Sequence, residues 1–199
     1  MTSGSEPTLV VLHGHDSTSK HGDELARDLD PSGRWRHVAP EGPVETPSGN
    51  RAWFSVNQPG SLRSAGQQLS AVVDSFSREG SHPLVVVGYS QGAAAALCGL
   101  MGPLSPVVDG LAVISGFLAE EDGVTYDVAR LVRTPVLVQH GIDDEVVPEF
   151  FATDLASMLR GSGVEVTLQR LAAGHSITPE GLAAARLWLD GHLDGSPQD

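Results

Sequence analysis

Gly88-Tyr89-Ser90-Gln91-Gly92 lies between an apolar β-branched run and an alanine-rich run. The preceding Leu84-Val85-Val86-Val87 has the composition of a buried strand, and the following Ala93-Ala94-Ala95-Ala96-Leu97 is a strong helix former. A Gly-x-Ser-x-Gly motif in this context predicts a sharp strand–turn–helix that exposes the serine hydroxyl above the sheet edge. The helix N-terminus would offer free backbone N–H groups to a developing negative charge. Ser90 is therefore a candidate nucleophile.

The composition is that of a single globular domain. The chain has 199 residues, of which 40% are hydrophobic and 19% charged, so it is long enough to bury a core of its own. Cys98 is the single cysteine, which rules out an internal disulfide and favours a reducing compartment. The first seven residues lack the basic start and apolar centre of a signal peptide. We therefore expect a cytoplasmic protein.

The charge balance is strongly acidic, with 25 Asp and Glu residues against 12 Lys and Arg residues and a formal net charge of −13. Nucleic acids and anionic membrane surfaces are bound by clustered Lys and Arg, so the composition argues against both as partners. No apolar run approaches the roughly 20 residues that a membrane-spanning helix needs. We expect no membrane span.

Short apolar runs alternate with helical patterns along most of the chain. The expected strands are Thr8–Leu12, Trp35–Ala39, Leu84–Gly88, Leu111–Ile114, Pro135–Gln139 and Val164–Arg170. The expected helices are Asp23–Leu29, Leu62–Phe76, Gln91–Met101, Glu149–Leu159 and Pro179–Leu189. Such alternation predicts an α/β fold in which helices cover both faces of a mainly parallel sheet of about six strands. The one long irregular stretch, Pro40–Gly60, has the length of a binding loop.

Chemically reactive residues follow the expected strands at the ends where open parallel sheets bind their ligands. Ser90 follows the third strand, His140-Gly141-Ile142-Asp143-Asp144 the fifth, and Gly174-His175 the sixth. A serine hydroxyl needs a neighbouring imidazole to take its proton, and a carboxylate must orient that imidazole and stabilise its cation. All three residue types are available at one sheet edge. The residues alone leave Asp143 and Asp144 open as the acid.

Six short motifs are spread from residue 12 to residue 175. They are Leu12-His13-Gly14, Ala39-Pro40 with Arg51-x-Trp53-Phe54, Gly88-Tyr89-Ser90-Gln91-Gly92, Ser115-Gly116, His140-Gly141-x-x-Asp144-x-x-Val147-Pro148 and Gly174-His175. Together they resemble the α/β-hydrolases, and within them the phospholipase/carboxylesterase group that includes acyl-protein thioesterases. The resemblance implies a catalytic domain over residues 1–190. From the sequence itself we expect a flexible C-terminal tail over residues 191–199.

The same resemblance assigns roles to five residues. It implies Ser90 as the nucleophile, Asp144 as the acid and His175 as the base. It also implies an oxyanion hole made by the backbone N–H groups of His15 and Gln91.

Six apolar residues are candidates for lining the substrate pocket, because they lie in the long loop or near strand ends. They are Trp53, Phe54, Phe117, Leu118, Val146 and Ile177. Buried packing is an equally good interpretation of each. The segment between the fifth and sixth strands is too short to build a large lid, which indicates an open site for small or extended acyl groups.

The stretch His13-Gly14-His15-Asp16 has the composition of a metal site. A metallo-β-lactamase-type site needs His-x-His-x-Asp-His, but Ser17 and Thr18 stand at the last two positions. We therefore expect no metal and no cofactor. In the simpler interpretation, His13 supports the oxyanion loop by hydrogen bonds and His15 sits at its tip.

These observations predict a serine carboxylesterase that cleaves small-molecule esters or thioesters through an acyl-enzyme. One alternative is a catalytically silent hydrolase fold that binds a ligand. A dienelactone-hydrolase-like enzyme would carry Cys in place of Ser90, and a cutinase-like enzyme would be secreted and have paired cysteines. The sequence leaves open the acyl length, the leaving group and the oligomeric state.

Overall fold

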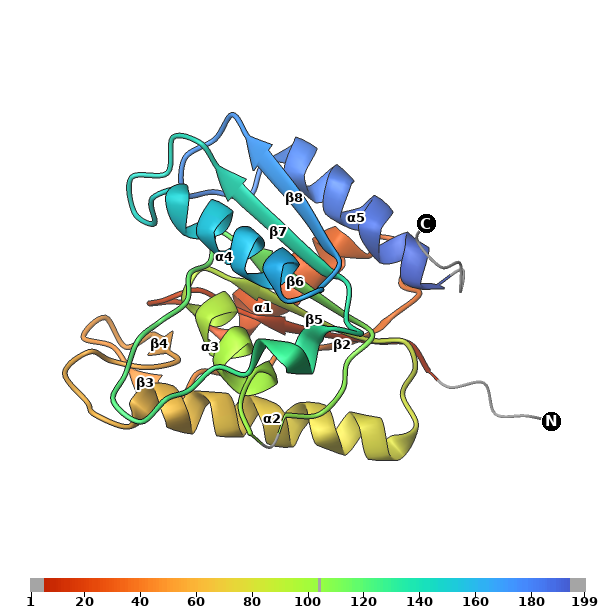
Figure 1. The fold of residues 1–199 in the computed structure, drawn as a ribbon. Coiled ribbons are helices and arrows are strands. Elements are labelled where there is room, and N and C mark those ends of the chain that lie inside the picture. The colour runs from red at the N-terminus through yellow and green to blue at the C-terminus, as the bar shows by residue number, and fades with distance from the viewer. Residues whose placement is uncertain (1–5, 104, 194–199) are drawn as a thin grey trace.

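A single parallel sheet forms the centre of the molecule (Figure 1). The structure, a computed structural model, describes residues 6–103 and 105–193. The sheet contains β1 (Thr8–Leu12), β2 (Arg36–Val38), β5 (Leu84–Tyr89), β6 (Gly110–Ile114), β7 (Val136–Gly141) and β8 (Val166–Leu171). Its order is β2-β1-β5-β6-β7-β8, and every neighbouring pair is parallel. The predicted fold class, a single-domain α/β-hydrolase fold with about six strands, is confirmed.

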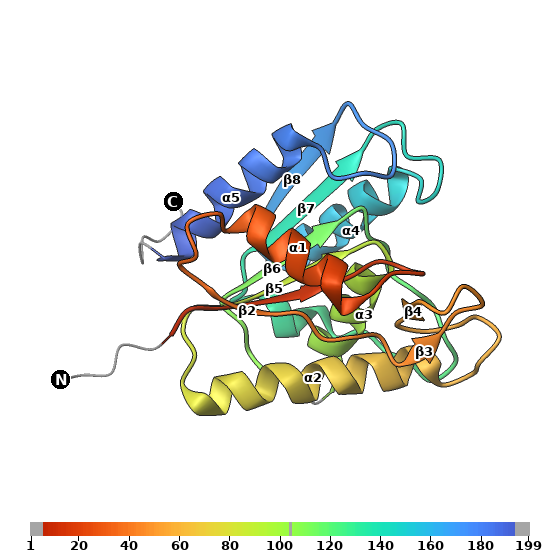
Figure 2. The ribbon, with the colours of Figure 1, turned by 180° about the vertical axis from the view of Figure 1, so that it is seen from behind.

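Helices cover both faces of the sheet (Figures 1 and 2). One face carries α1 (Ser19–Leu29) and α5 (Pro179–Leu193), and the other carries α2 (Ser61–Glu79), α3 (Gln91–Leu100) and α4 (Phe150–Gly161). A short 3₁₀ helix, η1 (Val128–Leu131), precedes β7. Side chains alternate along each strand, so Val86 joins the α2–α3–α4 core and Val85 the α1–α5 core. Burial on both faces explains why the central strands read as continuous apolar runs.

The observed elements match the predicted ones except at their ends and in one loop. Helix α2 runs past its predicted end to Glu79, and the next residue, Gly80, has the left-handed φ of 84° that closes many helices. The stretch predicted as an irregular loop contains an antiparallel pair, β3 (Val44–Glu45) and β4 (Arg51–Ala52). Strands of two residues are too short to produce a periodic pattern, so they could not be predicted from the sequence.

The first three residues of the predicted C-terminal tail are not irregular. Helix α5 continues to Leu193, so residues 191–193 are helical. Residues 194–199 of the predicted tail lie outside the described residues. Within residues 6–103 and 105–193, no helix is both long and apolar enough to cross a membrane.

Candidate active site

Ser90 sits at the sharp turn between β5 and α3, with φ of 53° and ψ of −119°. A β-carbon at Gly88 would lie 2.4 Å from Cα of Ala93, and one at Gly92 would lie 2.4 Å from the carbonyl oxygen of His13. Only glycine fits at both positions, because these neighbours are backbone atoms. The pentapeptide therefore folds as the sequence predicts, and Ser90 projects from a strained backbone at the carboxyl edge of the sheet.

Three side chains form one hydrogen-bonded chain at this edge, which we call the Ser90–His175–Asp144 chain. The Nδ1 atom of His175 is 2.7 Å from Oδ2 of Asp144, and its Nε2 atom is 2.9 Å from Oγ of Ser90. Because the carboxylate can only accept, Nδ1 carries the proton, and Nε2 then accepts from the serine hydroxyl. Ser90 and Asp144 are 8% and 6% exposed. The imidazole is thus set to take the serine proton.

Asp144 is held in its ionised form by donors on both oxygens. The backbone N–H groups of Val146 and Val147 donate to Oδ1, each at 2.9 Å, while His175 donates to Oδ2. Burial by itself would raise the pKa of Asp144, but the hydrogen bonds from Val147, His175 and Val146 outweigh it and lower the pKa below its usual range. The side chain of Asp143 is exposed. The geometry therefore brings Asp144, and not Asp143, to His175.

His140 is a buried residue of the site to which the sequence assigned no role. Its Nε2 atom is 2.7 Å from the carbonyl oxygen of Val147 and 3.3 Å from Oδ2 of Asp144. Since both oxygens are acceptors, Nε2 carries the proton. His140 thus fixes the turn whose N–H groups hold Asp144. The signal was its place next to Gly141, at the start of the motif that ends in Val147-Pro148.

The loops that carry Asp144 and His175 lie against each other. Pairing between β7 and β8 continues to Gly141 and Leu171, and the N–H of Ile142 then donates to the carbonyl oxygen of Leu171 at 2.8 Å. A β-carbon at Gly141 would lie 2.3 Å from the carbonyl oxygen of Ala173. This close approach sets the position of one loop relative to the other.

The predicted oxyanion donors are the backbone N–H groups of His15 and Gln91, and the residue before His15 lies next to Ser90, because a β-carbon at Gly14 would lie 3.6 Å from Cβ of Ser90. Among the described residues, neither the N–H of His15 nor that of Gln91 donates a hydrogen bond to the protein. The Nδ1–H of His13 donates to the carbonyl oxygen of Gly14 at 2.7 Å, and its Nε2 accepts from the N–H of Gly42 at 3.0 Å. Burial lowers the pKa of His13, which agrees with a neutral ring. His13 supports this loop by hydrogen bonds, as the sequence predicts.

Two of the candidate pocket residues belong to the core. Trp53 is 0% exposed and Phe54 is buried beside it. The carboxamide of Gln91 accepts from the N–H of Trp53 at 2.8 Å and donates to the carbonyl oxygen of Phe54 at 2.9 Å. The structure therefore places both aromatic rings in the packing behind the loop, where they present almost no surface to a substrate.

The remaining candidates are more accessible. Phe117, Leu118 and Ile177 are half-buried, and Val146 is 69% exposed. The ring of Phe117 lies 6.2 Å from that of Phe151.

Sequence reasoning missed Phe151 and its exposed neighbour Phe150, whose rings stack 4.4 Å apart at the start of α4. The sequence signal for them was a pair of adjacent aromatic residues shortly after Asp144.

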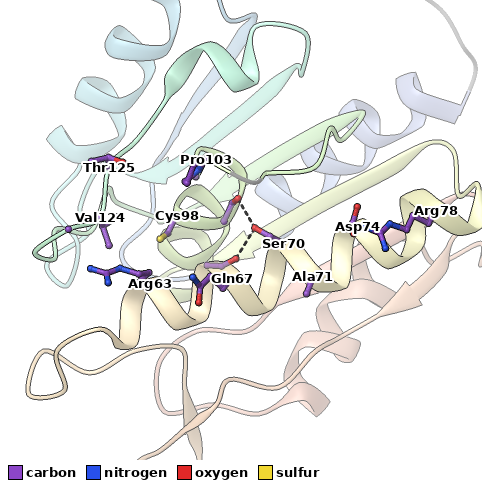
Figure 3. A pocket seen from close by; sticks show the side chains of 14 residues that line it. Arg63, Gln67, Ser70, Ala71, Asp74, Arg78, Cys98, Pro103, Val124 and Thr125 are labelled. Atoms are coloured by element: carbon purple, nitrogen blue, oxygen red, sulfur yellow. Dashed lines mark hydrogen bonds and ion pairs between the residues drawn. The ribbon is translucent and has the colours of Figure 1, made fainter.

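A cavity of about 580 Å³ lies away from Ser90, between α2, α3 and the segment 123–125 (Figure 3). It adjoins a close helix crossing, where Oγ of Ser70 donates to the carbonyl oxygens of Gly66 and Gly99. Cys98 borders it, and burial raises the pKa of this thiol to about 11. Cys98 is therefore a buried small apolar residue and not a second nucleophile. Within residues 6–103 and 105–193, no group of three His, Cys, Asp or Glu side chains could hold a metal ion.

Several proteins with similar sequences are named as carboxylesterases. A relative from Oryza sativa subsp. japonica, named a probable carboxylesterase, is 30% identical over 179 residues, which are 80% of this chain and 66% of that protein. Carboxylesterase SOBER1 of Arabidopsis thaliana is 29% identical over 177 residues, 79% of this chain and 76% of SOBER1. A second rice relative, 29% identical over 96% of this chain and 86% of its own length, is named a probable inactive carboxylesterase. The chain thus spans only part of each relative.

Solved structures share the fold. Acyl-protein thioesterase 2 of Zea mays superposes with a TM-score of 0.76 at 23% identity, over 97% of this chain and 96% of that one. The sequence profile of the family described as Phospholipase/Carboxylesterase matches residues 2–193. The chain therefore belongs to the phospholipase/carboxylesterase family of α/β-hydrolases.

Proposed function

We propose that this protein is a serine carboxylesterase that cleaves small-molecule esters or thioesters. The observation that carries the proposal is the Ser90–His175–Asp144 chain, in which bonds of 2.7 and 2.9 Å join a buried carboxylate to a serine on a strained turn. The family supports a hydrolase of this class. It also favours this assignment over the cutinase-like and dienelactone-hydrolase-like alternatives.

In the first step, Oγ of Ser90 attacks the ester carbonyl while its proton moves to Nε2 of His175. The imidazolium that forms is stabilised by Asp144, which stays ionised. The carbonyl oxygen becomes an oxyanion, which the N–H groups of His15 and Gln91 stabilise by roughly 3 kcal/mol each. Within residues 6–103 and 105–193, neither N–H group donates a hydrogen bond to the protein, which supports this role.

In the second step, the tetrahedral intermediate expels the alcohol or thiol, which takes the proton from Nε2 of His175. The product is an acyl-enzyme on Ser90. A water molecule then gives a proton to the same nitrogen and attacks the acyl carbonyl. When the second intermediate collapses, the acid is released, and Oγ of Ser90 takes the proton back from Nε2 of His175.

The acyl group would meet apolar side chains near the site. Val146 follows Asp144 by two residues and is largely exposed, and the exposed Phe150–Phe151 pair continues the same segment. These surfaces support small or extended apolar acyl groups.

The single cysteine, Cys98, supports a reducing compartment, for which we propose the cytoplasm.

Labelling with a fluorophosphonate, together with a panel of p-nitrophenyl esters of increasing chain length, tests the proposal. We expect labelling at Ser90 and turnover that chelator leaves unchanged. Ser90→Ala should lose both without a change in melting temperature, whereas Ser176→Ala, at the exposed serine beside His175, should keep both. A wild-type protein that is folded but neither labelled nor active on the whole panel would favour a silent, ligand-binding role.

A further inference from the structure

The two proposed oxyanion donors come from different segments of the chain. His15 lies in the loop after β1, and Gln91 begins α3. An oxyanion hole works only if its donors are held within about 0.5 Å of the productive geometry. Something in the structure must therefore fix the loop of His15 relative to the start of α3.

The side chain of Gln91 provides the first link. Its Oε1 accepts from the N–H of Trp53 and its Nε2 donates to the carbonyl oxygen of Phe54, at 2.8 and 2.9 Å. Both bonds are buried, so water does not compete for either partner. The carboxamide thus fastens the backbone of residues 53–54 to the residue whose own N–H is a proposed donor.

The indole of Trp53 provides the second link. Its Nε1–H donates to the carbonyl oxygen of His13 at 2.8 Å, in a buried bond. The same oxygen lies against the turn between β5 and α3 that carries Ser90, because a β-carbon at Gly92 would approach it to 2.4 Å. The imidazole of His13 then donates from Nδ1 to the carbonyl oxygen of Gly14, the residue before His15. The hydrogen bonds therefore run without interruption from Gln91 to the loop of His15.

We propose that Trp53 is a positioning residue that sets the spacing between the two oxyanion donors, a role that rests on the proposed function. Trp53 is 0% exposed, so it acts through Gln91 and His13 and not by touching substrate. Loss of its indole N–H removes the donor to a buried carbonyl oxygen, and the loop must move for that oxygen to find another partner. The spacing of the donors changes with it.

The test is Trp53→Phe, which keeps an aromatic ring and removes Nε1–H. We expect kcat for a p-nitrophenyl ester to fall about 10-fold, less than the 100-fold or more that follows removal of a whole donor, while KM stays within about twofold. The affinity for an alkylboronic acid, which forms a tetrahedral adduct on Ser90, should fall by the same factor as kcat/KM. Trp188→Phe is the matched control, because Trp188 is a buried indole of α5 on the opposite face of the sheet.

A Trp53→Phe protein with wild-type kcat and wild-type boronate affinity overturns the proposal. A lower melting temperature with unchanged kinetics per folded molecule does so too, since that is the result of a purely structural role. If Trp53→Phe does not fold, Gln91→Met tests the other end of the connection, because it removes the carboxamide and keeps the backbone N–H. The same parallel loss in kcat/KM and boronate affinity is expected there. Failure of the proposed function is distinct, since wild-type protein would then neither turn over ester nor bind boronate.

Discussion

The edge of the sheet around Ser90 and the cavity between α2 and α3 are built in opposite ways. At the sheet edge, the carboxylate of Asp144 receives three hydrogen-bond donors, and the serine and histidine beside it face each other. At the cavity, the charged side chains are already satisfied: Arg78 pairs with Asp74 at 2.7 Å, and Arg63 donates to a backbone carbonyl oxygen. What distinguishes the sheet edge is the convergence of its polar groups on Ser90, and not the size of the space beside them.

The largest effect should come from the acid of the Ser90–His175–Asp144 chain. Asp144→Asn should lower kcat about 10,000-fold, because the amide cannot hold His175 in the required tautomer. Asp143→Asn changes the neighbouring, exposed carboxylate and should leave kcat within about twofold. Steady-state rates on one p-nitrophenyl ester decide between them. A larger loss in the Asp143 variant would reassign the acid.

The next effect should come from the buried ring behind Asp144. His140→Leu removes the donor to the carbonyl oxygen of Val147, so the turn that holds Asp144 shifts and kcat should fall about 100-fold with little change in KM. His140→Gln keeps an N–H donor of similar reach and should recover part of the loss. Measurements of kcat and KM, with the melting temperature of each variant, test both expectations. Equal kcat in the leucine variant and wild type would remove His140 from the site.

A third comparison uses acid stability. The pKa of folded Asp144 lies below its unfolded value of about 3.9, so its contribution to stability is complete above pH 3.9 and is lost as the pH falls through the folded pKa. Asp144→Asn should therefore cost about 2 kcal/mol at pH 7, the size of a hydrogen bond to a charged group, and less near pH 3.

The control is Asp74→Asn at the cavity rim. Its ion pair with Arg78 is exposed, so the variant should change the free energy of unfolding by at most about 1 kcal/mol at pH 7. Urea titrations at the two pH values measure both variants. A gap between wild type and Asp144→Asn that widened toward pH 3 would contradict the expected sign.

The smallest effect should follow from filling the cavity. Ala71→Leu adds apolar volume at its lining, away from Ser90. Because no group of the Ser90–His175–Asp144 chain lies there, kcat/KM should stay within about twofold and the melting temperature near that of wild type. A large fall in ester turnover would mean that the two regions communicate.

Local pattern was enough to predict the sheet, its five covering helices and the serine turn, because burial on both strand faces and helical periodicity leave direct traces in sequence. It was also enough to bring Ser90, His175 and the neighbouring Asp143 and Asp144 to one edge, whereas the choice of Asp144 came from the family resemblance. The side-chain roles of Gln91 and His140 could not be predicted from periodicity, because each side chain binds backbone groups of a loop. For His140, the only sequence signal was its place in the motif that ends in Val147-Pro148. The hairpin of β3 and β4 was too short to be recognised.

Gly141 has a consequence for how the specificity of such an enzyme could change. Its lack of a side chain lets the two loops that carry the acid and the base pack as one unit, so neither can be lengthened or repacked alone. Under the proposed function, variation in acyl preference would fall on side chains exposed from this unit, such as Val146, and on neighbouring surfaces such as the Phe150–Phe151 pair. Under the proposed function, the side chains that perform the reaction and the surfaces that select the substrate could then be altered separately.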